Sequence, residues 1–214
     1  MFIVKLWETP LVGFSWLLII VFSICFHELM HAVTAKWQGD STAADLGHIS
    51  MNPLKQMGLV SLFMLFFIGI AWGAVPVNRY NLRHKYSDAL VSFAGPFANL
   101  LLCTLSILLA SLAFVVIKDA LVLKNLVQFF QLAALLNLVL FVLNMCPIPT
   151  FDGWHVLCNF FPRLEHAVNN SEFNKGATLV VMIILFKNIS KIFAVSQIAV
   201  AHAIEYFAKL FMGG

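Results

Sequence analysis

Two long stretches without a charged side chain limit what this chain can fold into. Residues 89–117 contain no Asp, Glu, Lys or Arg, and neither do residues 125–151. At about 1.5 Å per helical residue, each stretch can cross the roughly 30 Å hydrocarbon core of a bilayer. Lipid offers backbone polar groups no hydrogen-bonding partner, so a spanning segment must be a helix or part of a closed barrel. Continuous apolar runs without alternation predict helices.

The composition supports a membrane protein. Hydrophobic residues make up 61% of the 214 residues and charged residues 11%, whereas a soluble domain has roughly 25% charged residues. Further apolar segments at 10–35 and 176–211 predict an all-α polytopic membrane protein with about four to five transmembrane helices, the last segment being one bent helix or two. We expect a single domain over residues 1–214. The net charge of +3 is spread along the chain, which predicts no nucleic-acid partner.

The apolar segment 59–72 leaves two topologies open. It is shorter than the roughly 17 residues of the shortest transmembrane helix, which favours a re-entrant segment that dips into the membrane and returns. If this segment crossed the membrane instead, Asp152 would lie on the opposite face of the membrane from the inner end of the first span. The flanking Gly and Pro residues indicate that Leu46–Met51 and Ala74–Val77 form short strands, so residues 46–77 are predicted as a re-entrant or β-hairpin element.

The distribution of basic residues favours the re-entrant topology. It places seven basic residues on one face: Lys36, Lys55, Arg79, Arg83, Lys85, Arg163 and Lys175. Three remain on the other face: Lys5, Lys118 and Lys124. A crossing segment would divide the same residues into four and six, which is a weaker asymmetry. Basic residues accumulate on the cytoplasmic side of membranes, so the first face is predicted to be cytoplasmic.

The first predicted span contains His27-Glu28-Leu29-Met30-His31, which has the pattern H-E-x-x-H. Residues i and i+4 of a helix lie on one face, so both imidazoles can point at the same spot. Such a pair is typical of zinc sites, and Glu28 can act on a water molecule there without being a ligand. Ionisable side chains inside a span are costly and usually mark a functional site. The alternative is a polar cluster that bonds neighbouring helices.

A catalytic zinc ion normally has three protein ligands and one open position. The third ligand should be a histidine or carboxylate on the same face: Asp40, Asp45, Asp152, His48, His84, His155 or His166. Asp152 is the best placed, because it directly follows the predicted span 125–151. Pro147 and Pro149 predict a rigid, extended strip that holds this carboxylate and exposes backbone edges to a peptide. The alternative for Asp152 is an ordinary helix cap.

Two motifs resemble the signatures of the site-2 proteases, a family of intramembrane metalloproteases. The family patterns H-E-x-x-H and N-x-x-P-x-P-x-x-D-G are matched by residues 27–31 and 144–153, in the expected order and separation. Three further stretches look like the small bacterial and archaeal branch without accessory domains: residues 39–53, 71–78 and 94–102. The resemblance covers about residues 10–162, and the paired motifs are highly specific.

The resemblance implies one Zn²⁺ ion per chain, held by His27, His31 and Asp152, with Glu28 as general base. It also implies a site within the bilayer near the cytoplasmic face, where a transmembrane helix of a membrane-protein substrate is cleaved. We therefore expect a zinc metalloendopeptidase in the cytoplasmic membrane of a prokaryote. Its expected partners are the lipid bilayer and the substrate helix, and its oligomeric state is left open.

Four further residues are candidates for substrate binding: Asn99, Asn144, Pro147 and Pro149. Asn144 is expected to bind the substrate backbone or an oxyanion. Asn99 has the alternative of a hydrogen bond between helices. His155 stands where the family often has Arg, and it either supports Asp152 as a neighbouring partner or packs as an ordinary histidine.

Two other functions fit the same residues. A membrane metal carrier would use the same histidines and aspartate, but transport does not require Glu28 beside the ligands. A binding pseudo-protease would hold membrane helices without cutting them, and the intact ligand set argues against it. Replacing Glu28 therefore discriminates between an enzyme and a carrier.

Overall fold

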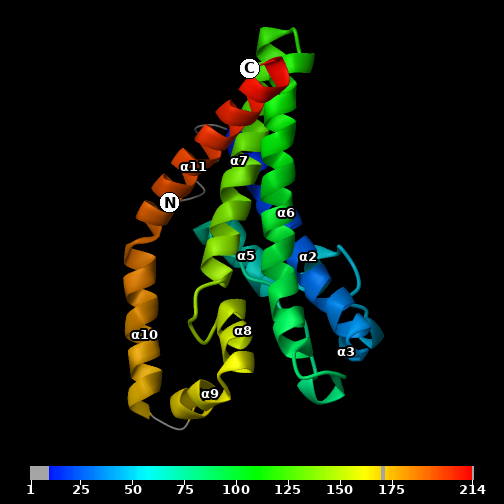
Figure 1. Ribbon diagram of the computed structural model, residues 1–214, viewed down its shortest axis with the longest axis vertical. Coiled ribbons are helices and arrows are strands. Elements are labelled where there is room, and N and C mark those ends of the chain that lie inside the picture. Colours follow the sequence, from blue (N-terminus) through cyan, green and yellow to red (C-terminus); the bar gives the residue numbers. More distant parts are fainter. Residues whose placement is uncertain (1–9, 170–171, 214) are drawn as a thin grey trace.

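The computed structural model describes residues 10–169 and 172–213, as helices and the loops that join them (Figure 1). The long helices are α2 (Pro10–Trp37), α6 (Ser87–Val116), α7 (Ala120–Asn144), α10 (Glu172–Lys187) and α11 (Ile189–Met212). The short helices are α3 (Thr42–Asp45), α4 (Pro53–Gln56), α5 (Gly58–Ile68), the 3-10 helix η1 (Arg79–Asn81), α8 (Asp152–Phe160) and α9 (Pro162–Asn169).

Three of the long helices, α2, α6 and α7, are long and apolar enough to cross a membrane. Helices α10 and α11 meet at a 50° bend, and together they pass the same test as a fourth, broken span. The predicted all-helical membrane class is therefore confirmed, with three to four candidate spans in the described part of the chain. The apolar segment after residue 176 is two helices joined at a bend.

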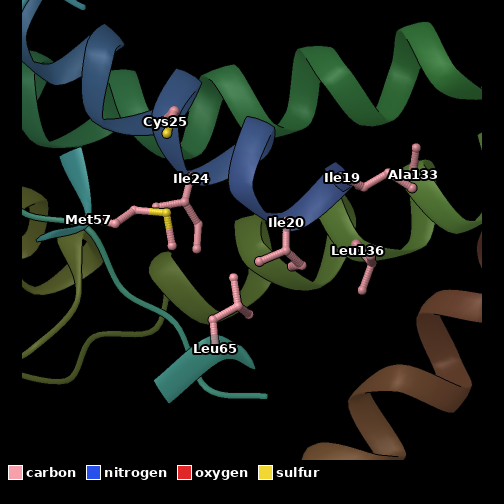
Figure 2. Packing of buried hydrophobic residues seen from close by; sticks show 8 residues of the cluster. All are labelled: Ile19, Ile20, Ile24, Cys25, Met57, Leu65, Ala133 and Leu136. Carbon is pink, nitrogen blue, oxygen red and sulfur yellow. The ribbon is translucent and has the colours of Figure 1, made fainter. Parts of the chain in front are cut away.

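Helix α6 lies at the centre of the bundle and packs against α2, α7, α8 and α11. Figure 1 shows α6 and α7 running side by side along the long axis, with α11 leaning against their upper ends. One core cluster joins α2 to α5 and α7, and Figure 2 shows its members: Ile19, Ile20, Ile24, Cys25, Met57, Leu65, Ala133 and Leu136. This cluster holds α2, the helix that carries the two histidines, against α5 and α7.

Helix α5 is shorter than a helix that crosses a membrane. Its 11 residues span about 16 Å, roughly half of the hydrocarbon thickness. The helix ends at Gly69, whose φ of 85° is the left-handed conformation typical of a glycine at this position. The chain then turns back, because the Ser61 hydroxyl donates to the Trp72 carbonyl and accepts from the Trp72 amide. This path of the chain matches the re-entrant topology predicted for residues 59–72.

The two strands predicted beside this segment are absent from the described residues. Residues 46–51 form turns, in which Gly47 N donates to Ala44 O and His48 N donates to Ala43 O. Residues 74–77 have no regular secondary structure, and among these residues only Ala74 N makes a backbone hydrogen bond, to Gln56 O. Gly and Pro mark turns as well as strand ends, and here they mark turns.

The segment 145–151 also differs from its prediction. It is folded into turns, in which Ile148 N donates to Cys146 O and Phe151 N donates to Ile148 O. These bonds use backbone groups that an extended strip would have offered to a peptide. The turns return the chain toward α6, so that α8 begins at Asp152 beside the histidines of α2.

Candidate metal centre

Three side chains from two distant parts of the chain converge on one point. His27 Nε2 lies 3.0 Å from His31 Nε2 and 3.1 Å from Asp152 Oδ2. His31 Nε2 lies 3.4 Å from Asp152 Oδ1. Both histidines are buried, and Asp152 is partly buried. The structure thus brings together the three residues that were predicted as metal ligands.

The neighbouring helix α6 sets the orientation of both imidazole rings. His27 Nδ1 lies 2.6 Å from Asn99 Oδ1, and His31 Nδ1 lies 2.6 Å from the Val91 carbonyl oxygen. The residue number rises along α2 as it falls along α6, so the two helices are antiparallel here. Positions 91, 95 and 99 are one helical turn apart and lie on one face of α6, opposite the i, i+4 histidine pair. The acceptors at 91 and 99 therefore meet the two rings.

This arrangement calls for a cation. Because Nδ1 of each ring faces an acceptor oxygen, Nδ1 carries the hydrogen in a neutral ring and Nε2 presents a lone pair. Two such nitrogens and a carboxylate would repel one another at these distances. A tetrahedral zinc ion about 2 Å from each ligand separates the ligand atoms by about 3.3 Å. The ligand atoms of His27, His31 and Asp152 all lie within 4.8 Å of one another, so the donor set fits zinc.

Two glycines make room for the site. A Cβ at Gly95 would lie within 3.0 Å of Nε2 in both His27 and His31. A Cβ at Gly73 would lie within 3.0 Å of the Glu28 carboxylate. Real Cβ atoms essentially never approach other atoms this closely. Gly95 therefore provides steric space for rings that Asn99 and Val91 hold in place, whereas a side chain at position 73 would push the Glu28 carboxylate aside.

The variant Gly95→Ala is expected to bind zinc about 100-fold more weakly than the wild type. The added methyl group displaces the ligand nitrogens, and metal sites tolerate displacements of only about half an ångström. Zinc affinity is measured by competition with a chromophoric chelator. Gly176→Ala is the matched control, because a Cβ at this helical glycine meets nothing within 4 Å. Wild-type affinity in Gly95→Ala would show that the metal does not lie between these nitrogens.

Glu28 lies beside the converging ligands but is not one of them. It lines a cavity of about 520 Å³ that also contains His27, His31 and Asp152. The cavity walls come from α2, α6, the end of α7, the start of α8, α10 and the irregular segment 70–77. A carboxylate beside an open metal position is the arrangement that proton transfer from water requires.

The other predicted candidates for the third ligand do not join this group in the described part of the chain: Asp40, Asp45, His48, His84, His155 and His166. Asp40 has a different role. Its buried carboxylate accepts hydrogen bonds from Thr42, from the Asn78 amide and from the Asn81 side chain. Burial acts to raise the pKa of Asp40, but these hydrogen bonds outweigh it and hold the pKa below its usual range. Asp40 thereby anchors the loop that follows the cavity wall.

A cluster of charged residues and one histidine contributes Arg79, Asp88 and His155 to the cavity wall. The Arg79 guanidinium pairs with Asp88 at 3.2 Å and with Glu165 at 3.1 Å, and it also contacts His155 Nδ1. Burial, together with Arg79, lowers the pKa of His155 from its usual value, so this ring is neutral at pH 7 and Nδ1 accepts from Arg79. The cluster ties α8, which begins at Asp152, to α6 and α9.

The four candidates for substrate binding differ in position. Asn144 lines the cavity, whereas Pro147 and Pro149 do not. Asn99 also lines it, but both ends of its amide are engaged by the protein, through His27 and Asn137. The Asn99 side chain therefore supports a predicted ligand directly. Of the four, Asn144 is the one that lines the cavity and whose side chain makes no hydrogen bond within the described residues.

Sequence reasoning missed several residues of this site. Neither the Val91 carbonyl nor Gly95 was predicted to contact a ligand; Gly95 was expected to serve small-residue helix packing, and Arg79 entered only the prediction of topology. A signal for the first two was present: the 91, 95, 99 spacing on a predicted span matches the spacing of the histidine pair. Arg79 had no such signal, because its partners come from three separate elements.

Comparisons with known proteins point to the same chemistry. A family model described as "Peptidase family M50" matches residues 15–121 and 111–187. The candidate zinc metalloprotease YwhC of Bacillus subtilis (strain 168) is 32% identical over 171 residues, which cover 78% of this chain and 77% of the relative. The candidate zinc metalloprotease Rip2 of Mycobacterium tuberculosis (strain ATCC 25618 / H37Rv) is 34% identical over 172 residues. That match covers 77% of this chain and 63% of Rip2.

No solved structure matches the chain. The family match nonetheless includes the H-E-x-x-H motif and Asp152, and it extends over most of the sequence. It confirms the resemblance inferred from the two signatures, as well as the predicted zinc cofactor and protease activity. The chain belongs to peptidase family M50, the site-2 proteases, and is a zinc metalloprotease.

Proposed function

We propose that this protein cleaves peptide bonds within or near the transmembrane helices of membrane-protein substrates, with Glu28 as general base. The observation that carries the proposal is the position of Glu28. It lines one cavity together with His27, His31 and Asp152, between the candidate spans α2, α6 and α7. A water molecule and a peptide carbonyl at this cavity would be inside the membrane and within reach of the carboxylate.

The chemistry follows from the ligand set and Glu28. Zinc, when bound, lowers the pKa of water toward 7 and polarises a carbonyl oxygen. His27, His31 and Asp152 would hold the ion and leave one position open. Glu28 takes the proton from water as the water attacks the carbonyl carbon, and it then delivers this proton to the leaving nitrogen. This route needs no covalent intermediate with the protein.

The irregular segment 70–77 is the proposed binding site for the substrate backbone. It is fixed at Trp72 by Ser61 and at Ala74 by the Gln56 carbonyl, and Asn78 just beyond it is held by Asp40. Gly73, Val75 and Val77 line the cavity, and within the described residues their backbone groups make no hydrogen bonds. A substrate segment that has unwound can pair with these groups as an added strand.

Unwinding leads to a prediction about substrates. A helix hides its amides in internal hydrogen bonds, so residues that weaken the substrate helix should speed cleavage. Replacing one Ala near the scissile bond by Gly costs the helix about 1 kcal/mol, which predicts up to about fivefold faster cleavage. The measurement is kcat/KM for a series of synthetic transmembrane peptides, with Gly placed far from the bond as control. Equal rates across the series would contradict an unwinding step.

The cavity is proposed to face the cytoplasm of a prokaryotic cell. At its end of the bundle, the last turn of α2 and the short helices and loops carry Lys36, Lys55, Arg79, Arg83, Lys85 and Arg163. Lys118 lies in the turn between α6 and α7, and Lys124 in the first turns of α7. Basic residues accumulate on the cytoplasmic side. Lys5 lies outside the described residues, and for Lys175 the backbone alone is described.

The experiment that tests this function combines zinc analysis with proteolysis. The purified protein in detergent is assayed for bound zinc and for cleavage of a synthetic transmembrane peptide, before and after chelation and after zinc is restored. Cleavage that follows the zinc content supports the proposal. Bound zinc without cleavage of any transmembrane peptide would instead favour a metal carrier or a helix-binding protein.

A further inference from the structure

A buried chain of hydrogen bonds connects the metal centre to the backbone of α7. His27 Nδ1 lies 2.6 Å from Asn99 Oδ1, Asn99 Nδ2 donates to Asn137 Oδ1 at 3.1 Å, and Asn137 Nδ2 donates to the Ala133 carbonyl at 2.9 Å. Asn99 is 0% exposed and Asn137 is 2% exposed. The chain crosses from α2 through α6 to α7, and Asn137 does not line the cavity.

The direction of every bond in this chain follows from its last member. A backbone carbonyl can only accept, so Asn137 must turn its NH₂ group toward Ala133 and its oxygen toward Asn99. That oxygen can only accept, so Asn99 must in turn direct its NH₂ group to it. The Asn99 oxygen then faces His27, and Nδ1 must be the nitrogen that carries the hydrogen.

The second histidine reaches the same state by a shorter route. His31 Nδ1 meets the Val91 carbonyl directly, at 2.6 Å. Both rings therefore keep Nε2 free of hydrogen and aimed at Asp152. In each case a backbone carbonyl sets the tautomer. For His27 this carbonyl, that of Ala133, acts through the hydrogen-bonded side chains of Asn137 and Asn99.

We propose that Asn137 is a positioning residue of the metal centre, which through Asn99 fixes the hydrogen of His27 on Nδ1. This inference rests on the proposed function to the extent that the three ligands bind zinc. Without Asn137, the Asn99 amide loses the partner that fixes it, since its other acceptor, the Ser23 carbonyl, is 3.5 Å away. A flipped Asn99 would donate to His27 Nδ1, and the hydrogen would move to Nε2, where it blocks metal binding.

The test compares three variants by zinc affinity. Asn137→Leu removes both amide bonds and is expected to weaken zinc binding by about 10–100-fold, as for other residues that orient metal ligands. Asn137→Asp is expected to stay within a few-fold of the wild type. A buried carboxylic acid in its neutral form donates through its hydroxyl to Ala133 and accepts from Asn99, as asparagine does.

Ser111→Ala is the matched structural control. Ser111 is buried in α6, and its hydroxyl lies 2.8 Å from the Ile107 carbonyl of the same helix and 3.1 Å from the Ile204 carbonyl of α11, so this change also removes a buried polar group between two helices. Ser111 is remote from the ligands, so the Ser111→Ala protein should bind zinc with the affinity of the wild type. If Asn137→Leu does not fold, Asn137→Ala removes the same amide without an apolar replacement of equal size.

A second measurement reports the tautomer itself. In the zinc-free protein, the ¹⁵N chemical shifts of His27 distinguish hydrogen on Nδ1 from hydrogen on Nε2. We expect Nδ1–H in the wild type and in Asn137→Asp, and a population of Nε2–H in Asn137→Leu. A role limited to joining helices would lower stability but would leave this spectrum unchanged.

Two outcomes would overturn the inference while leaving the proposed function intact. One is wild-type zinc affinity in Asn137→Leu, and the other is equal loss in Asn137→Leu and Asn137→Asp. Absence of zinc from the wild-type protein is a different result, because it would overturn the proposed function and the inference together.

Discussion

Replacing Glu28 by glutamine is expected to leave zinc bound and to slow peptide cleavage by about 10²–10⁴-fold. Glutamine keeps the size of the side chain but cannot take a proton from water. Zinc should remain, because Glu28 is not among the converging ligand atoms. Zinc content and cleavage of a transmembrane peptide are measured on the same preparation, so that the two effects are separated.

The control for this experiment is Glu205→Gln. Glu205 is an exposed carboxylate of α11, paired with Lys209 at 2.7 Å and remote from the cavity. This variant should cleave as the wild type does. A Glu28→Gln protein that cleaves at the wild-type rate would refute the general-base mechanism. One that loses zinc would show that Glu28 is a ligand, and the choice of Asp152 would then need revision.

Asp152→Asn is expected to weaken zinc binding by more than about 100-fold and to abolish cleavage. The amide keeps the shape of the side chain, but it removes the charge that binds a divalent cation. Loss of a ligand should exceed the 10–100-fold effect of residues that only orient ligands. Zinc affinity by chelator competition is the measurement, with α-helix content recorded to confirm folding.

Asp119→Asn is the matched control for this change. Asp119 also stands at the start of a helix, where its carboxylate accepts from the amides of Leu121 and Val122 at 2.9 Å. Asparagine caps helices about as well as aspartate, so zinc binding should not change. If Asp152→Asn also bound zinc like the wild type, the third ligand would lie elsewhere, and the re-entrant path of residues 59–72 would lose its main functional consequence.

The helical membrane class was predicted correctly, and the convergence of His27 and His31 could be expected from the sequence, because both depend on local patterns. Long charge-free runs can be satisfied in lipid only by helices, and the i, i+4 spacing of His27 and His31 needs nothing beyond one helix to place both rings together. The predictions that failed were the strands at 46–51 and 74–77 and the extended strip at 145–151. Each relied on Gly and Pro, which are equally common in turns.

The sequence by itself determined that a membrane helix carries His27, His31 and Glu28 on neighbouring positions. It indicated Asp152 as the best-placed third ligand but could not show that this side chain lies next to the histidines, since Asp152 is 125 residues beyond His27. The tertiary structure alone decided that α8 returns to α2 and that Asn99 and Val91 face the two rings. Helical periodicity is local, whereas the meeting of helices and the direction of a buried hydrogen bond depend on partners far along the chain.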